Sequence, residues 1–210
     1  MTFYLDPSRA CGACSRLLLT ASASGLCRTC VEDCTEIVHD RASKANALFT
    51  YEGPLKTPLA RLKYNRDFGI ARLFANLLAP RIASLPVRRK LVIIPVPMSL
   101  PRRLRRGCNH TELIAQWLPL DTLGVTLLPR GMFTRLHRPA QVGLSRAQRR
   151  HNTSGAFLLK SRSDRPLRGA SVLILDDVIS TGSTLRGCFE ALDASGAEDI
   201  EGLALLRRVA

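Results

Sequence analysis

The segment Val172-Leu-Ile-Leu-Asp-Asp-Val-Ile-Ser-Thr-Gly-Ser-Thr184 decides which fold the sequence predicts. Its four leading aliphatic residues are typical of a strand buried on both faces, as strands of a parallel sheet are. Asp176 and Asp177 stand at the carboxyl end of that strand, and a turn containing Gly182 leads into a helix expected over residues 183–195. Ligands of open α/β sheets bind at the carboxyl ends of the strands. We therefore expect a ligand site at this turn.

The chemistry of the turn suits a sugar phosphate. Backbone N–H groups of such a turn, together with the dipole of the following helix, can hold a phosphate, and a glycine lets the backbone approach it closely. Asp176 and Asp177 would repel a phosphate, but they suit the hydroxyls of an attached sugar. A phosphate at one end and a diol at the other describe a ribose 5-phosphate. The alternative is a strand–helix turn with incidental acids. A Walker A loop is excluded, because its lysine is missing.

Strands and helices alternate along most of the remaining sequence, which predicts an α/β fold with a mostly parallel sheet. The expected strands are residues 47–51, 91–94, 125–128, 172–175 and 203–206. The other expected helices are residues 55–64, 68–85 and 109–118, the last opened by a capping box from Asn109 to Glu112. Residues 130–152 are basic and weakly patterned, so a loop with a short helix at its end is expected there.

Four cysteines near the start of the chain form two C-x-x-C pairs: Cys11 and Cys14, then Cys27 and Cys30. Two such pairs can place four thiolates around a tetrahedral Zn²⁺, which would be structural because no coordination position stays open. A redox role is the alternative, although no thioredoxin-like strand and helix flank either pair. Cys34 could compete as a ligand, but we expect a spare thiol. These features predict a zinc ribbon in residues 1–40, ahead of a second domain in residues 47–210.

The charge of the chain is high and uneven. There are 31 Lys and Arg against 17 Asp and Glu, a net charge of +14. Residues 88–150 hold 13 of the basic residues and two acids, so this segment carries +11. A field of this kind attracts phosphates, nucleic acid or acidic lipid, although a surface that serves solubility is the simpler alternative. The sequence contains no apolar run of bilayer length and its first nine residues do not resemble a signal peptide, so we expect a cytoplasmic location.

The segment 172–184 resembles the phosphoribosyl pyrophosphate (PRPP) motif of type I phosphoribosyltransferases. Beyond it, the chain resembles the ComF (competence protein F) family over nearly its whole length. The cysteine ribbon precedes the transferase-like part, as in that family. Residues 95–109, from Pro95-Val-Pro97 to Arg106-Gly107 and Asn109, are similar to one family block. Residues 141–157, from Gln141 to Gly155-Ala-Phe157, are similar to a second.

The resemblance implies roles for three groups of residues. PRPP would be held by Asp176, Asp177, Ser180, Thr181, Gly182, Ser183 and Thr184. The pyrophosphate loop would be Pro95, Val96, Pro97, Met98 and Ser99. A basic cleft for pyrophosphate or nucleic acid would comprise Arg102, Arg103, Arg105, Arg106, Arg135, Arg138 and Arg149. Mg²⁺ would arrive with PRPP and be held mostly by ligand oxygens and water.

The resemblance also implies a function in natural transformation, where the protein would handle incoming single-stranded DNA together with other competence proteins. An active phosphoribosyltransferase acting on an unidentified base is the alternative, and an interaction scaffold without a ligand is the third hypothesis. Two differences from the related patterns matter. Cys108 and His110 replace Phe and Gln of the family block, and Ser180 stands where purine-salvage transferases carry an acid. A serine cannot act as a proton donor or acceptor near neutral pH, which weakens a purine-salvage assignment.

Overall fold

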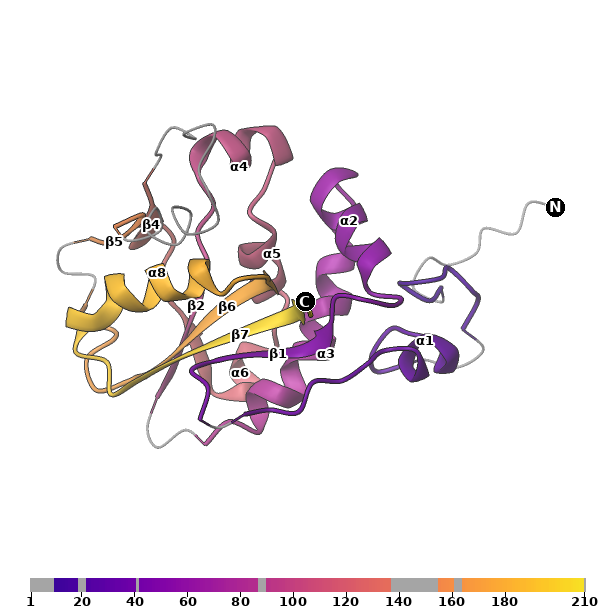
Figure 1. Ribbon diagram of the computed structural model, residues 1–210, viewed down its shortest axis with the longest axis horizontal. Helices are drawn as coiled ribbons and strands as arrows, with labels where there is room; N and C mark the ends of the chain where they lie inside the picture. The colour runs from indigo at the N-terminus through magenta and orange to yellow at the C-terminus, as the bar shows by residue number, and fades with distance from the viewer. Residues whose placement is uncertain are drawn as a thin grey trace.

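A computed structural model describes residues 10–18, 22–40, 42–86, 90–136, 155–160 and 164–209 (Figure 1). In these residues the fold is built on a five-stranded sheet, in which every neighbouring pair of strands is parallel, in the order β1-β7-β6-β2-β3. The strands are β1 (Ala45–Thr50), β2 (Leu91–Pro95), β3 (Val125–Leu127), β6 (Ser171–Ile179) and β7 (Asp199–Arg207). The predicted α/β class and parallel sheet are thus confirmed.

Helices cover both faces of the sheet, because its central strands are apolar on both sides. The first face packs against α2 (Lys56–Tyr64), α3 (Ile70–Ala83), α5 (His110–Gln116) and α6 (Leu120–Leu123). The second face packs against α8 (Ser183–Leu192), which is followed by a 3-10 turn, η2 (Asp193–Ser195). Successive residues of β6 alternate between the two cores, with Leu173 and Leu175 on the first face and Val172 and Ile174 on the second.

The strand β6 is longer than predicted and contains the two acids rather than ending before them. Its pairing with β7 continues to Ile179, opposite Arg207, so the extended backbone is supported beyond the aliphatic run. On its other side β6 pairs with β2 only as far as Leu175, opposite Pro95. Asp176 and Asp177 therefore project past the carboxyl end of β2, which leaves space beside them for a ligand.

One strand lies where a loop was expected over residues 130–152. The strands β4 (Phe133–Arg135) and β5 (Phe157–Leu159) form a separate antiparallel pair, so the expected loop is wrong over residues 133–135. The rings of Phe133 and Phe157 stack across this pair with their centroids 5.8 Å apart. Strands of three residues are too short to show an alternating pattern. Residues 137–154, with the helix expected at their end, lie outside the described residues.

The helix α5 begins where the sequence predicts, but half of the expected capping box is wrong. The side chain of Asn109 accepts a hydrogen bond from the backbone N–H of Thr111, as a helix N-cap does. Glu112 does not complete the box, because its carboxylate instead accepts from the guanidinium of Arg130, with 2.9 Å between Nε and Oε2. Arg130, which follows β3, therefore binds the carboxylate that the capping box would have used.

The cysteine-bearing segment packs onto α3 and shares the first core. Its helix α1 (Arg28–Glu32) follows Cys27, and Cys11, Leu26 and Cys30 are buried with the residues of α3. Residues 35–37 then run antiparallel to β1. The predicted division into residues 1–40 and 47–210 stays a prediction. Within the described parts of the chain, no helix combines the length and apolarity needed to cross a membrane.

Candidate functional site

A cleft of about 190 Å³ opens at the carboxyl ends of β2 and β6. The chain crosses from β2 towards β3 on one side and from β6 towards β7 on the other, so the cleft lies at the point where the crossovers diverge. The sequence-predicted residues that line it are Val96, Pro97, Met98, Arg102, Arg106, Arg135, Asp176, Asp177 and Thr184. The structure thus brings the acids of β6, the loop after β2 and three arginines around one space.

The two acids of β6 are in different environments. Asp176 is buried, and its Oδ1 accepts a hydrogen bond of 2.8 Å from the backbone N–H of Asp177. Burial, followed by the neighbouring charge of Asp177, raises the pKa of the Asp176 carboxyl to about 7. The Oδ1 of Asp177 lies 2.9 Å from the ammonium Nζ of Lys63, which belongs to α2. Asp177 is therefore paired with a cation, whereas burial favours the neutral form of Asp176.

His110, the first residue of α5, also lines the cleft, near α4 (Leu100–Arg106). Its side chain is buried, and its Nε2 accepts a hydrogen bond of 2.7 Å from Nη1 of Arg106. This bond requires a lone pair on Nε2, so the imidazole is neutral with its proton on Nδ1. Burial is the main reason that the pKa of His110 is lowered to about 4. Among the described residues, His110 Nδ1 and Arg106 Nε find no hydrogen-bond partner, although both atoms are buried.

The turn between β6 and α8 is built as the sequence predicts. Gly182 has φ of 72°, in the left-handed region that disfavours residues with a side chain, and α8 begins directly after it. The hydroxyl of Thr181 lies 3.1 Å from that of Ser183. Ser180, Gly182, Ser183 and Thr184 surround a small hollow of about 20 Å³ that adjoins Asp176. Hydroxyls and the first turn of a helix thus meet the cleft at one end.

The loop after β2 is anchored by polar side chains from the start of α5. The carbonyl oxygen of Val96 accepts from Nδ2 of Asn109 at 3.0 Å and from the hydroxyl of Thr111 at 2.8 Å. Both side chains are buried. Of the predicted pyrophosphate loop, Ser99 is the N-cap residue of α4 and Pro95 faces a different hollow. The loop is therefore fixed in place before any ligand arrives.

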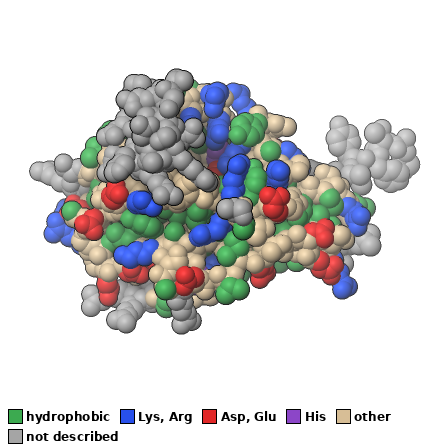
Figure 2. Space-filling view, in the orientation of Figure 1, with side chains coloured by type: hydrophobic (Ala, Val, Ile, Leu, Met, Phe, Trp, Pro, Cys, Tyr) green, Lys and Arg blue, Asp and Glu red, His purple; other side chains and the backbone are tan. Residues whose placement is uncertain are grey.

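The arginines predicted to form a basic cleft fall into three groups. Arg102, Arg106 and Arg135 line the cleft, and the pKa of the Arg135 guanidinium is lowered by burial. Arg103 and Arg105 lie on α4, and Nη2 of Arg103 is 3.8 Å from a carboxylate oxygen of Glu112. Arg138 and Arg149 lie outside the described residues. Figure 2 shows Lys and Arg side chains gathered beside α4 on this face.

Sequence reasoning missed some of the lining residues. Lys63, Asn109 and Thr111 were not expected there, and His110 was given no functional role. Lys63 belongs to a helix that ends more than a hundred residues before Asp177, so local pattern gives no sign of their contact. The positions of Asn109 and Thr111 could have been predicted, because both residues stand at an expected helix start shortly after the loop that they anchor.

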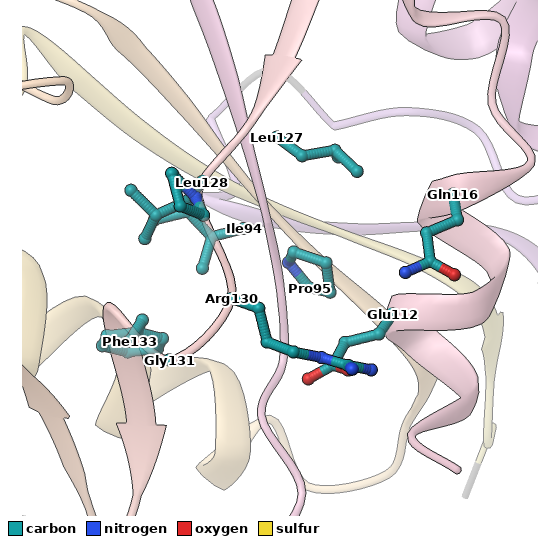
Figure 3. A pocket seen from close by; sticks show the side chains of 10 residues that line it. Ile94, Pro95, Glu112, Gln116, Leu127, Leu128, Arg130, Gly131 and Phe133 are labelled. Atoms are coloured by element: carbon teal, nitrogen blue, oxygen red, sulfur yellow. The ribbon is translucent and has the colours of Figure 1, made fainter.

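A second hollow, of about 170 Å³, lies on the other side of β2 from the two acids (Figure 3). Its walls are mostly apolar and come from the ends of β2 and β3 and from the loop that follows β3. The paired side chains of Glu112 and Arg130 stand at its edge together with Gln116. The loop after β2 separates this hollow from the cleft, so it is not part of the candidate site.

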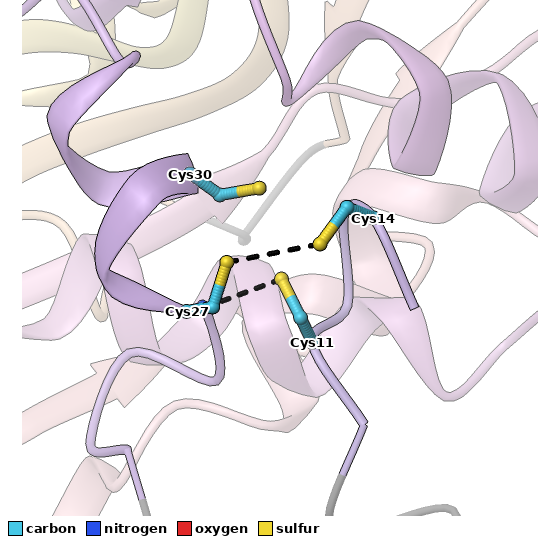
Figure 4. A group of neighbouring side chains, drawn as sticks. All are labelled: Cys11, Cys14, Cys27 and Cys30. Atoms are coloured by element: carbon cyan, nitrogen blue, oxygen red, sulfur yellow. Dashed lines mark hydrogen bonds between the residues drawn. The ribbon is translucent and has the colours of Figure 1, made fainter. Parts of the chain in front are cut away.

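The four predicted metal ligands form one cluster (Figure 4). The Sγ atoms of Cys11, Cys14, Cys27 and Cys30 all lie within 4.8 Å of one another, and those of Cys14 and Cys27 are 3.7 Å apart. Four sulfurs placed about 2.3 Å from a tetrahedrally coordinated ion would be roughly 3.8 Å apart. The cluster therefore fits a metal ion, and Cys34 is outside it, with its thiol donating to the carbonyl of Cys30 at 3.1 Å.

The thiols of this cluster respond differently to their surroundings. Burial disfavours the Cys11 thiolate, but backbone N–H groups of Cys14, Cys27 and Ala13 outweigh that effect and lower its pKa to about 6. Burial and the neighbouring thiols raise the pKa of Cys30 far above its usual range. A bound cation would remove this conflict, because it favours the thiolate form of every ligand.

The chain is similar to known phosphoribosyl transferase domains and competence proteins. A family described as the phosphoribosyl transferase domain matches residues 119–210. Competence protein F of Haemophilus influenzae is 37% identical over 75% of this chain and 69% of its own length. The DNA utilization protein YhgH of Salmonella typhi is 32% identical over the same shares. Adenine phosphoribosyl transferase of Trypanosoma brucei superposes with a TM-score of 0.41 and 11% identity, over 76% of this chain and 81% of its own.

The parallel sheet, the β6–α8 turn and the family match define a phosphoribosyltransferase-type fold. The similarity to competence protein F extends over most of both chains, so it identifies the family within this class. The chain belongs to the competence protein F (ComF) family.

Proposed function

We propose that this chain binds PRPP in the cleft between β2 and β6 and handles single-stranded DNA with the basic surface beside it. The observation that carries the proposal is the division of charge in the cleft. Asp176 and Asp177 occupy one wall, whereas Lys63, Arg102, Arg106 and Arg135 supply four cations within the same 190 Å³ space. A ligand that is both a diol and a polyanion matches this arrangement, whereas a neutral sugar or a simple phosphate matches half of it.

We infer the orientation of PRPP from three parts of the cleft: the turn around Gly182, the two acids, and the loop of residues 95–99 with the arginines of α4. The 5-phosphate would lie at the turn around Gly182, where hydroxyls and the first N–H groups of α8 offer donors. The ribose hydroxyls would face Asp176 and Asp177. The pyrophosphate would lie against the loop of residues 95–99 and the arginines of α4, and Mg²⁺ would bind with it through phosphate oxygens and water.

The DNA part of the proposal rests on the outer surface of the cleft. No residue of α4, all of which is described, is buried, and four of its seven residues are arginines. Tyr64 at the end of α2 is 68% exposed and has the guanidinium of Arg106 5.3 Å from its ring centroid. Cations that follow a phosphate backbone and an exposed ring on which a base can stack are the two parts of a single-strand binding surface. The relatives named for competence and for DNA utilization support the same function.

The metal proposed for the cysteine cluster is Zn²⁺. A set of four thiolates in a closed tetrahedron is the usual ligand set of structural zinc. Such a site holds the segment around α1 against α3 and takes no part in ligand binding. Direct metal analysis of the purified chain should therefore give about one zinc per chain.

The proposal is tested by two titrations on the full chain. Calorimetry with PRPP, with and without Mg²⁺, should show one binding site, and a labelled single-stranded oligonucleotide should bind with an affinity that falls as salt is added. Absence of PRPP binding would contradict the first half, and DNA binding that is absent or independent of salt would contradict the second. Release of pyrophosphate that depends on an added base would instead identify an active transferase.

A further inference from the structure

Lys63 lines the cleft beside the two acids. It belongs to α2, which lies outside the segment 172–184 that resembles the PRPP motif. Its Nζ lies 2.9 Å from Oδ1 of Asp177, with the two side chains 16% and 13% exposed. The other oxygen of Asp177, Oδ2, lies 3.5 Å from Nε2 of His110. His110 already accepts a hydrogen bond from Arg106 at that nitrogen, so the neutral imidazole has no proton to give Asp177 there. Lys63 is therefore the main counter-charge of Asp177.

We propose that Lys63 determines specificity, so that the cleft accepts a ribose phosphate with an anionic group at C1 and discriminates against the same sugar without one. This inference rests on the proposed PRPP site and names the chain's own residue that selects the ligand. The hydroxyls of a ribose have to displace the ammonium from Asp177 before they can bind its carboxylate. Lys63 is then left with its charge in a largely desolvated space and needs a new anion.

The neighbours of Lys63 determine which anion can replace Asp177. The cleft that Lys63 lines also includes Val96, Pro97 and Met98 of the loop proposed to hold pyrophosphate. A ligand that carries a diphosphate at C1 supplies hydroxyls to Asp177 and anionic oxygens to Lys63 in one event. Ribose 5-phosphate supplies the hydroxyls alone and leaves a nearly buried ammonium without a partner, which is the costly half of breaking such an ion pair.

The role of Lys63 predicts a change in a ratio of affinities rather than a simple loss of binding. The affinities of PRPP and ribose 5-phosphate are measured by calorimetry, both with Mg²⁺, on the unsubstituted chain and on Lys63→Met. The unsubstituted chain should prefer PRPP. In Lys63→Met that preference should fall by on the order of tenfold to a hundredfold, the usual worth of one charge-assisted hydrogen bond. PRPP should bind more weakly, and ribose 5-phosphate as well as before or better.

A matched control is available on the same helix. Lys56 begins α2, is exposed, and has its ammonium over the ring of Tyr51 rather than in the cleft. Lys56→Met removes the same charge from the molecule and should leave the preference for PRPP unchanged. Lys63→Gln gives a second neutral side chain to measure if Lys63→Met is poorly folded, and thermal unfolding reports the folding of each variant.

The possible results separate the inference from the proposed function. A preference for PRPP that survives in Lys63→Met and Lys63→Gln would overturn the role of Lys63 and leave the PRPP site intact. Equal affinities of the unsubstituted chain for PRPP and ribose 5-phosphate would also overturn the role of Lys63 and leave the PRPP site intact. If the unsubstituted chain binds neither sugar, the proposed PRPP site is wrong and the inference falls with it.

Discussion

Gly12 of the cysteine-bearing segment lies directly against Leu73 of α3. A Cβ atom placed on Gly12 would come within 2.7 Å of Cδ2 of Leu73, closer than two carbon atoms can approach without a shift. The carbonyl oxygen of Gly12 also accepts a hydrogen bond from Nη1 of Arg61 on α2 at 3.4 Å. The cysteine-bearing segment is thus in contact with α2 and α3, two of the helices that cover the first face of the sheet. Lys63 follows Arg61 by two residues, in the last turn of α2.

Loss of the metal should therefore destabilise the whole described fold. We expect Cys14→Ser to lose bound zinc and to lower the midpoint of thermal unfolding by on the order of 5 °C or more, since metal binding and folding of such a segment are linked. Metal content and calorimetric unfolding measure the two effects. Cys34→Ser is the control, because Cys34 lies outside the cluster. Normal zinc content in Cys14→Ser would contradict the assignment of the ligands.

Asp176→Asn should separate a binding role from a structural one. The raised pKa of Asp176, about 7 against 3.8 for the ordinary carboxyl, means that the unfolded chain releases this proton more readily than the folded chain. The stability that Asp176 contributes is therefore present below pH 4 and is lost as the pH rises through 7. Asp176→Asn removes this loss, so the variant should gain stability relative to the parent at pH 8 while PRPP binds more weakly. Equal or lower stability at pH 8 would show that the carboxylate supports the fold.

The buried histidine predicts a pH effect of the opposite sign. The pKa of His110 is lowered from 6.5 to about 4, so the unfolded chain binds the proton more readily than the folded chain between these values. Stability from this group is complete above pH 6.5 and is lost as the pH falls through 4. By pH 5 the loss amounts to about 2 kcal/mol.

The variant His110→Gln isolates this effect from those of other groups. Urea unfolding of both proteins at pH 7 and pH 5 gives the change in their stability difference. This difference should shift in favour of His110→Gln by about 2 kcal/mol between the two pH values. A difference that stays constant with pH would show that the imidazole is not the neutral, buried group described above.

The arginines of α4 should set the salt dependence of DNA binding. A variant with all four replaced by alanine, at positions 102, 103, 105 and 106, lacks cations that can each neutralise one phosphate. For single strands the slope of log affinity against log salt should flatten by up to about 0.7 for each phosphate that the variant no longer neutralises.

The control for this variant removes four cations elsewhere in the chain. The control positions are Arg28, Lys56, Lys90 and Arg168. Oligonucleotide titrations at several salt concentrations should show a much smaller change of slope in the control. Equal changes of the salt slope in the two variants would show that the arginines of α4 are not a specific DNA-binding surface.

The sequence predicted the five strands of the parallel sheet, the turn and the cysteine cluster because each depends on residues close together in the chain. Val172–Leu175 is apolar enough to indicate a buried strand alone, and two C-x-x-C pairs define a ligand set by their spacing. The continuation of β6 to Ile179 could not be predicted, because it depends on pairing with β7 and not on apolar pattern. The contact of Lys63 with Asp177 was also hidden, since it depends on how α2 packs across the sheet edge.

The sheet order has a consequence for how the chain is made. β1, near the start, has β7 as its partner in the sheet, about 150 residues later, and β7 is also the neighbour of β6. Until the ribosome has released residues 199–207, one side of β6 and the sheet-facing side of β1 have unpaired backbone groups, and such edges invite wrong association. Newly synthesised chains that stall before this point should be the species most in need of a chaperone.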